Sequence, residues 1–205
     1  MPARRAPVTL PATEGLPGDP WLDRWLPLIG RHAAGLPILE LGCGGGRDSA
    51  ALAAAGHRVI GVDQSAQAIE KARQRVHTGT FHCQDLRAPF PVGDAAVGVV
   101  IASLSLHYFP WSETEELVRR VRRTLMPGGL LLCRLNSTND RHFGAVGHPE
   151  IEANYYNVDG EPKRFFDRAS VDRLFGDGWR TIDCGEWVID RYDQPKVAWE
   201  VALER

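Results

Sequence analysis

The chain has 205 residues, of which 43% are hydrophobic and 24% are charged. These fractions are close to the averages of folded proteins and argue against a disordered, collagen-like or coiled-coil chain. The 24 basic and 26 acidic residues give a formal charge of -2, too little positive charge to bind nucleic acid through bulk electrostatics. We expect one folded α/β domain with short appendages and no nucleic-acid partner.

The sequence predicts a cytoplasmic protein without a metal centre. No run of about 18 apolar residues could form a membrane span, and the basic residues 1–7 lack the apolar segment of a signal peptide. The four cysteines lie 40 or more residues apart and form no C-x-x-C pair, so neither a zinc site nor a disulfide framework is indicated. The sequence leaves the choice between a monomer and a dimer open.

Five prolines within residues 1–20 predict a tail or an extended strap, followed by a single domain over 21–205. Apolar residues at helical spacing over 21–29 predict a helix, which either only covers the core or also closes over a ligand. From Leu36 onward, short apolar strands alternate with helices, as is typical of a parallel sheet covered by helices.

The predicted elements follow from apolar periodicity and from caps. Strands are expected at 37–41, 58–62, 80–83, 97–102, 130–135, 180–192 and 196–203. Helices are expected at 47–55, 65–76, 112–125 and 167–175, with caps at Ser65, Ser112 and Asp167. The last two strands are close enough for an antiparallel hairpin. Residues 136–166 look irregular and too long for a plain connection, so we expect a functional insertion or lid there.

A glycine-rich loop follows the first predicted strand, with the sequence E-x-G-x-G-x-G over residues 40–46. Glycines let the backbone approach a ligand, and the next helix offers unpaired N–H groups at its N-terminus. The dinucleotide pattern G-x-G-x-x-G fails because Arg47 or Ser49 stands where its third glycine belongs, and no lysine completes a P-loop. An NAD-dependent oxidoreductase is therefore disfavoured, but it remains the rival from another reaction class.

The loop resembles the first motif of the class I S-adenosylmethionine-dependent methyltransferases. Further matches follow in order: Asp63 ends the second strand, Gln84-Asp85-Leu86 ends the third, and residues 125–130 resemble an L-x-P-G-G-x turn. The resemblance spans about residues 36–135. It implies an α/β, Rossmann-like, seven-stranded and mostly parallel sheet with an antiparallel last strand and helices on both faces. S-adenosylmethionine would lie across the carboxyl ends of the first two strands.

The resemblance also implies roles for single residues. Asp63 would accept both ribose hydroxyls, which an ionised carboxylate can do, and Asp85 with the backbone N–H of Leu86 would recognise adenine. Glu40 would orient the loop or meet the methionine ammonium through water. The predicted cofactor-binding set is Glu40, Gly42, Gly44, Gly46, Asp63, Gln64, Asp85, Leu86 and Ser103. In the alternative interpretation, without a ligand site, the glycines only make a tight turn and the carboxylates are solvated.

A sulfonium methyl group is already activated, so we expect in-line displacement in which the protein positions donor and acceptor and excludes water. Residues 103–109, after the central strand, should form the acceptor side. They lack the N/D-P-P-Y/F signature of enzymes that methylate bases or glutamine. His107 is the candidate catalytic base because of its position and its ordinary pKa near 6.5. A packing role for His107 is the alternative.

The predicted substrate-binding residues are Tyr108, Tyr155, Tyr156 and Arg164, because aromatic rings beside cations suit a small pocket for an anionic or polarizable acceptor. The layout is similar to the tellurite-resistance type of small-molecule methyltransferase and its thiopurine or thiol relatives. This closer resemblance implies a soft nucleophile, a thiol or a chalcogen oxyanion, and S-adenosylhomocysteine as the product. O- or N-methylation of a small metabolite and a non-catalytic S-adenosylmethionine-binding module are the alternatives.

Overall fold

The computed structural model describes residues 21–189 and 194–205. The predicted strap over residues 1–20 lies outside this part of the chain. Short helical segments open the described chain: η1 (Asp23–Trp25) and α1 (Leu26–Ala33). They occupy the place of the predicted helix over 21–29, and Trp21, Trp25 and Ile29 of its apolar stripe are buried.

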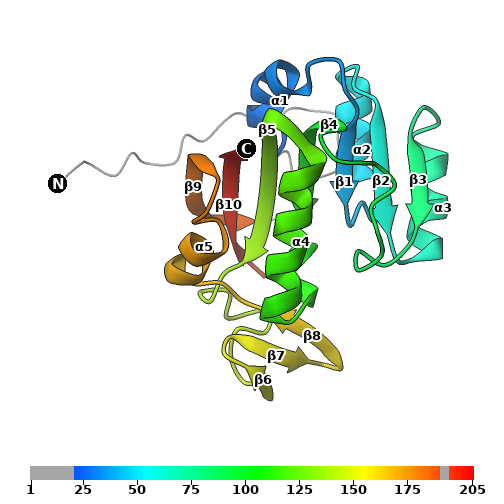
Figure 1. The fold of residues 1–205 in the computed structure, drawn as a ribbon. Coiled ribbons are helices and arrows are strands. Elements are labelled where there is room, and N and C mark those ends of the chain that lie inside the picture. The colour runs from blue at the N-terminus through cyan, green and yellow to red at the C-terminus, as the bar shows by residue number, and fades with distance from the viewer. Residues whose placement is uncertain (1–20, 190–193) are drawn as a thin grey trace.

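Seven strands form the main sheet in the order β3-β2-β1-β4-β5-β10-β9 (Figure 1). Neighbours from β3 to β5 pair in parallel, whereas β10 pairs antiparallel with both β5 and β9. The strands are β1 (Ile38–Leu41), β2 (Val59–Asp63), β3 (Thr80–Cys83), β4 (Val97–Ser103), β5 (Leu125–Asn136), β9 (Arg180–Ile189) and β10 (Lys196–Glu204). The predicted Rossmann-like sheet with an antiparallel last strand is confirmed.

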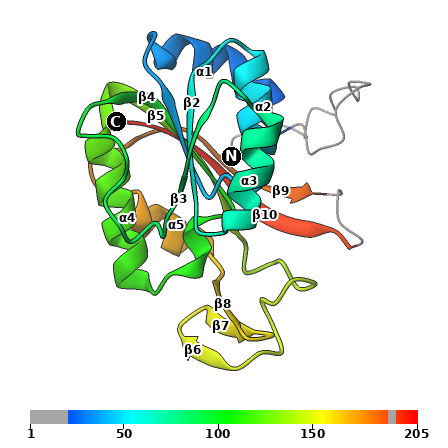
Figure 2. The same cartoon turned by 90° about the vertical axis from the view of Figure 1, so that its right-hand side faces the viewer.

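Helices cover both faces of the sheet (Figure 2). On one side lie α1, α2 (Arg47–Ala54) and α3 (Ala66–Arg75), and on the other lie α4 (Trp111–Thr124) and α5 (Arg168–Leu174). The central strand β4 supplies both layers of the core, since Val99 and Ile101 pack with the α1 side and Val100 and Ala102 with the α4 side. This two-sided burial explains its nearly unbroken β-branched sequence.

The capping box predicted at Ser112 is wrong, because α4 begins one residue earlier, at Trp111, after Pro110. The Thr114 hydroxyl donates to the Pro110 carbonyl, and the Trp111 N–H donates to Glu152 Oε1 at 2.7 Å. The start of this helix is therefore stabilised from a distant segment. The caps predicted at Ser65 and Asp167 are both present.

Residues 136–166 are not irregular as predicted. They contain a three-stranded antiparallel sheet made of β6 (Glu150–Glu152), β7 (Tyr155–Val158) and β8 (Glu161–Arg164), which projects from the main sheet (Figure 1). Asp159 and Gly160 join β7 to β8 with φ of 54° and 91°. Two successive residues with positive φ are what a tight two-residue hairpin turn requires.

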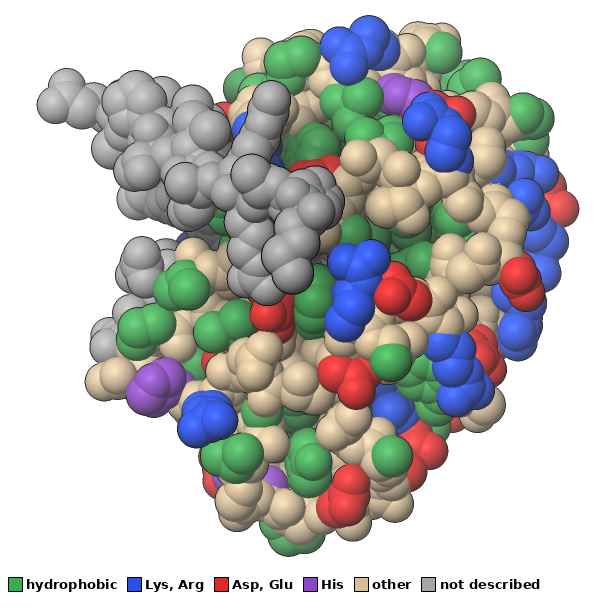
Figure 3. All heavy atoms as spheres, turned by 90° about the vertical axis from the view of Figure 1, so that its left-hand side faces the viewer, with side chains coloured by type: hydrophobic (Ala, Val, Ile, Leu, Met, Phe, Trp, Pro, Cys, Tyr) green, Lys and Arg blue, Asp and Glu red, His purple; other side chains and the backbone are tan. Residues whose placement is uncertain are grey.

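Oppositely charged side chains lie side by side on the surface. Over the described part of the face in Figure 3, Lys and Arg side chains neighbour Asp and Glu side chains. Arg168 and Asp172 of α5, for example, are paired at 2.9 Å. Among the described residues, no helix is long and apolar enough to cross a membrane.

Candidate active site

The loop between β1 and α2 is a sharp turn that glycine alone makes without strain. Gly42 and Gly46 have φ of 72° and 74°, in the left-handed region that other residues avoid. A Cβ on Gly42 would collide with Ser105, and one on Gly46 would lie 3.0 Å from Ala72 of α3. The glycines therefore let the loop pack against two other elements at the carboxyl ends of the strands.

Asp63 holds this loop in place. Its Oδ2 accepts a hydrogen bond from the Gly44 N–H at 2.9 Å, and its Oδ1 accepts one from the Ser65 N–H at 2.8 Å. An ionised carboxylate has about four acceptor positions. Each oxygen can therefore accept one further donor from a ligand.

A cavity of about 420 Å³ opens beside this loop at the carboxyl ends of β1, β2 and β3. Ligands of open α/β sheets bind at such strand ends, near the point where the strand order reverses. The Ser105 hydroxyl on its wall is buried and has no hydrogen-bond partner among the described residues. The lining is Gly42, Asp63, Gln64, Ser65, Asp85, Leu86, Arg87, Leu104, Ser105, Tyr108, Phe109, Glu161 and Pro162.

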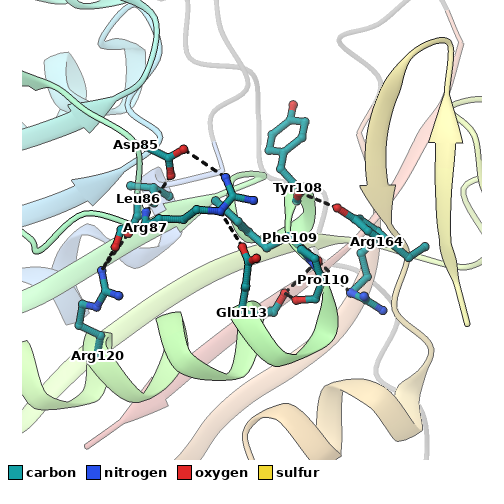
Figure 4. A network of polar contacts seen from close by, with 11 residues as sticks. Asp85, Leu86, Arg87, Tyr108, Phe109, Pro110, Glu113, Arg120 and Arg164 are labelled. Carbon is teal, nitrogen blue, oxygen red and sulfur yellow. Dashed lines mark hydrogen bonds and ion pairs between the residues drawn. The ribbon is translucent and has the colours of Figure 1, made fainter. Parts of the chain in front are cut away.

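Arg87 joins two acidic side chains at one wall of this first cavity (Figure 4). Its guanidinium donates to Asp85 at 3.1 Å and to Glu113 of α4 at 2.7 Å. Arg120, also on α4, donates to the carbonyl groups of residues 86–88 (Figure 4). The segment that carries Asp85 is thus fastened to α4 by two arginines.

A second cavity of about 350 Å³ adjoins the first, and Leu104 and Tyr108 line both. Strand β8 runs along the two cavities, with Glu161 and Pro162 on the first and Lys163 on the second. The lining of the second cavity is Ser103, Leu104, His107, Tyr108, Asn136, Phe143, Lys163 and Lys196.

His107 lies in the short helix η2 (Leu106–Tyr108) and is 3% exposed. Burial, together with the positive charges of Lys196 and Lys163, lowers the pKa of His107 to about 3. The imidazole is therefore neutral at pH 7, and its Nδ1 has no hydrogen-bond partner among the described residues. The ordinary pKa from which a catalytic base was predicted does not hold at this position.

Comparison with known proteins identifies this fold. Residues 38–129 match the methyltransferase domain family. The S-adenosylmethionine-dependent methyltransferase of Methanosarcina mazei has a TM-score of 0.72 at 17% identity, over 87% of this chain and 97% of that chain. The fold is that of the S-adenosylmethionine-dependent methyltransferases. Of two further solved neighbours with this fold, one holds S-adenosylmethionine and the other holds S-adenosylhomocysteine.

Curated relatives have diverse names. N-demethylindolmycin N-methyltransferase of Streptomyces griseus is 38% identical over 156 residues, which are 72% of this chain and 65% of that protein. Trans-aconitate 2-methyltransferase of Paracidovorax citrulli is 33% identical over 100 residues, which are 48% of this chain and 38% of that protein. The chain thus spans between 38% and 65% of the length of these two methyltransferases.

Six of the predicted residues meet at the first cavity of the methyltransferase fold: Gly42, Asp63, Gln64, Asp85, Leu86 and Tyr108. Glu40 lies behind the loop, 3% exposed, and accepts a hydrogen bond from Ser49. Burial and the nearby Asp48 raise its pKa above the ordinary value. Ser103 lines the second cavity instead and accepts from Arg134 Nε at 2.9 Å.

The other predicted substrate residues are not among the described residues that line the cavities, although two of them, Tyr155 and Arg164, contact the backbone of lining residues. The Tyr155 hydroxyl donates to the Tyr108 carbonyl at 3.0 Å, and Arg164 Nε donates to the Phe109 carbonyl at 3.3 Å. Tyr156 packs on Phe165, with ring centroids 6.0 Å apart. Direct contact of these three side chains with an acceptor stays a prediction.

Several lining residues were missed by the sequence analysis. Arg87 follows the predicted Asp85-Leu86 pair directly, so its place on the first cavity could have been inferred. Phe143 and Lys196 carry no local signal, because the sheet brings β10 beside the insertion from more than 50 residues away.

Proposed function

We propose that the first cavity binds S-adenosylmethionine and that a small molecule in the second cavity accepts its methyl group. The observation that carries this proposal is that the two cavities adjoin, since Leu104 and Tyr108 line both of them. A donor and an acceptor held in adjoining cavities lie in the proximity that group transfer requires.

The residues of the first cavity fit this cofactor. Asp63 has acceptor positions left for the ribose hydroxyls, Asp85 and the backbone N–H of Leu86 are available for adenine, and the unpartnered Ser105 hydroxyl can bind a polar group. When bound, S-adenosylmethionine supplies a methyl group that is activated on a sulfonium. The remaining work of the protein is to position the acceptor and exclude water.

The environment of His107 favours an acceptor that needs little deprotonation. With its pKa lowered to about 3, the neutral imidazole is a weak base. Its role is then to orient the acceptor through a hydrogen bond. Thiolates and chalcogen oxyanions are nucleophilic without a strong base, in line with the resemblance to the tellurite-resistance and thiopurine type, which stays a prediction. The relatives named for N-demethylindolmycin and for trans-aconitate support a small-molecule acceptor in general.

A methyl-transfer screen tests this proposal. The protein is incubated with S-adenosylmethionine and panels of thiols, oxyanions, amines and phenols, and S-adenosylhomocysteine is measured by mass spectrometry. We expect product formation with thiols or oxyanions. Product with phenols alone would contradict the soft-nucleophile class, and no product with any panel, despite tight cofactor binding, would indicate a non-catalytic binding module.

A further inference from the structure

The second cavity concentrates a scarce residue type. The whole chain has three lysines, Lys71, Lys163 and Lys196, against 21 arginines. Lys163 from β8 and Lys196 from β10 both line this cavity, although 33 positions separate them in the sequence. The fold therefore brings two compact, strongly hydrated cations to one small site.

Lys196 is held in position by a buried partner. Its Nζ lies 2.8 Å from Asp140 Oδ2, and the side chains of Lys196 and Asp140 are 10% and 0% exposed. Asp140 Oδ1 also accepts the Val197 N–H at 3.3 Å, which fixes the carboxylate. An ammonium group has three donors, so Lys196 can hold Asp140 and still donate into the cavity.

Lys163 has no such partner. Within residues 21–189 and 194–205, no hydrogen bond or ion pair joins its ammonium to another side chain. Lys163 and Lys196 carry two positive charges, Asp140 carries one negative charge, and His107 is neutral. The cavity therefore has a net charge of one positive unit, and a partly desolvated charge is stabilised by an opposite charge.

Asn136 adds a second requirement. Its side chain is 2% exposed, and its Oδ1 has no hydrogen-bond partner among the described residues. Its Nδ2 donates to the Arg164 carbonyl at 3.5 Å. A buried amide oxygen without a donor is costly, so a ligand that brings an N–H, O–H or S–H group to this point would relieve that cost.

We propose that the second cavity binds a monocarboxylate, with its carboxylate between Lys163 and Lys196 and a hydrogen-bond donor of the same molecule on Asn136. One negative charge balances the one positive charge of the cavity. A dianionic phosphate would leave a negative charge in excess, and a neutral molecule would leave Lys163 unpaired. This inference rests on the proposed function and names the class of its acceptor.

Calorimetry with matched probes tests the inference. The wild-type protein, saturated with S-adenosylhomocysteine, is titrated with indole-3-acetate, whose indole N–H can donate to Asn136, and with phenylacetate, which lacks such a donor. The corresponding amides and phenyl phosphate are titrated in the same way. We expect the carboxylates to bind about ten-fold or more tightly than the amides and the phosphate, as a charge-assisted contact predicts. Equal binding of carboxylate and amide, no carboxylate binding, or preference for the phosphate would overturn the inference.

Two lysine variants separate charge from fold. Lys163→Met keeps the length of the side chain without its charge, and we expect it to reduce carboxylate affinity about ten-fold while amide affinity stays unchanged. Lys71→Met makes the same change on the exposed surface of α3, and it should alter neither the carboxylate affinity nor the amide affinity. If both variants bind carboxylates as the wild type does, the cavity is not the carboxylate site. Unchanged S-adenosylhomocysteine affinity in Lys163→Met shows that the cofactor site is intact. If the wild type did not bind S-adenosylhomocysteine at all, the proposed function itself would be refuted.

Lysine acetylation gives an independent readout on the unmodified protein. Phenylacetate should slow the acetylation of Lys163 and leave that of Lys71 unchanged, since Lys71 lies on α3, away from the cavity. Equal rates at Lys163 with and without phenylacetate would contradict the proposed contact.

Discussion

Asp63 fastens the loop, and we propose that the same side chain also binds the ligand. Its two oxygens already accept the backbone N–H groups of Gly44 and Ser65. In Asp63→Ala these groups lose their acceptor and the ribose hydroxyls lose a carboxylate. We expect S-adenosylhomocysteine affinity to fall by about 1–3 kcal/mol, as for lost hydrogen bonds to a charged group. Isothermal titration calorimetry measures this directly.

The matched control is Asp94→Ala, which removes an exposed carboxylate that is not among the described lining residues of either cavity. Its affinity should equal that of the wild type. Asp63→Asn keeps an oxygen for one backbone N–H and should lose less affinity than Asp63→Ala. An unchanged affinity in Asp63→Ala would remove this residue from the cofactor site.

His107 links the acceptor cavity to the pH dependence of stability. Its pKa is lowered from 6.5 to about 3 by burial and by Lys196 and Lys163. Below pH 6.5 the unfolded chain therefore binds a proton at His107 that the folded protein does not bind. The contribution of His107 to the free energy of unfolding is therefore constant above pH 6.5. As the pH falls from 6.5 toward 3, the free energy of unfolding decreases by up to about 1.4 kcal/mol per pH unit.

The prediction is tested with His107→Gln, which does not titrate in this range. Urea unfolding at pH 7, 6 and 5 should give a steeper loss of the free energy of unfolding in the wild type than in the variant. The buried acids Glu40 and Glu200, whose pKa values are raised mainly by burial, remain in both proteins, so their effects cancel in the difference. Parallel slopes would show that His107 titrates normally.

At the scale of elements, the small sheet β6–β8 supports the start of α4. Glu152 of β6 accepts the Trp111 N–H at the start of α4 and pairs with Arg164 of β8, whose side chain is 3% exposed. Glu152→Ala leaves both groups without this partner. We expect it to lower the free energy of unfolding by about 1–2 kcal/mol, a value limited by the partial exposure of Glu152. Urea unfolding measures the loss.

Glu70→Ala is the matched control, because Glu70 is an exposed glutamate on α3 that accepts a hydrogen bond from Gln74. Its effect should stay within about 0.5 kcal/mol. Glu152→Gln keeps a neutral acceptor for the Trp111 N–H, so its free energy of unfolding should lie between those of Glu152→Ala and Glu70→Ala. If Glu152→Ala were as stable as Glu70→Ala, β6 would contribute nothing to the start of α4.

At the scale of the whole molecule, the sequence predicted what depends on local pattern. The parallel core followed from apolar strands such as 97–102, and the first cavity followed from the glycines of 42–46 with Asp63 and Asp85. Each of these residues lies at or just after the carboxyl end of a strand of the same parallel sheet, so their meeting is a consequence of topology. For the same reason, Leu86 and Gln64 could be placed from their neighbours alone.

The second cavity could not be predicted in this way. It depends on the antiparallel pairing that sets Ala198 opposite Asn136 and so brings Lys196 to the insertion. The strands β6 and β8 are three and four residues long and mostly polar, so they lack the alternation that identifies a half-buried strand. The turn at Asp159-Gly160 joins β7 to β8 and is the local signal from which this hairpin could have been predicted.

The central claim is that the first cavity binds S-adenosylmethionine. Titration of the protein with S-adenosylhomocysteine and with NAD, side by side in the calorimeter, tests it most directly. The loop with Arg47 and Ser49 in place of glycine predicts saturable binding of S-adenosylhomocysteine and no binding of NAD. Binding of NAD without binding of S-adenosylhomocysteine would contradict the proposed function.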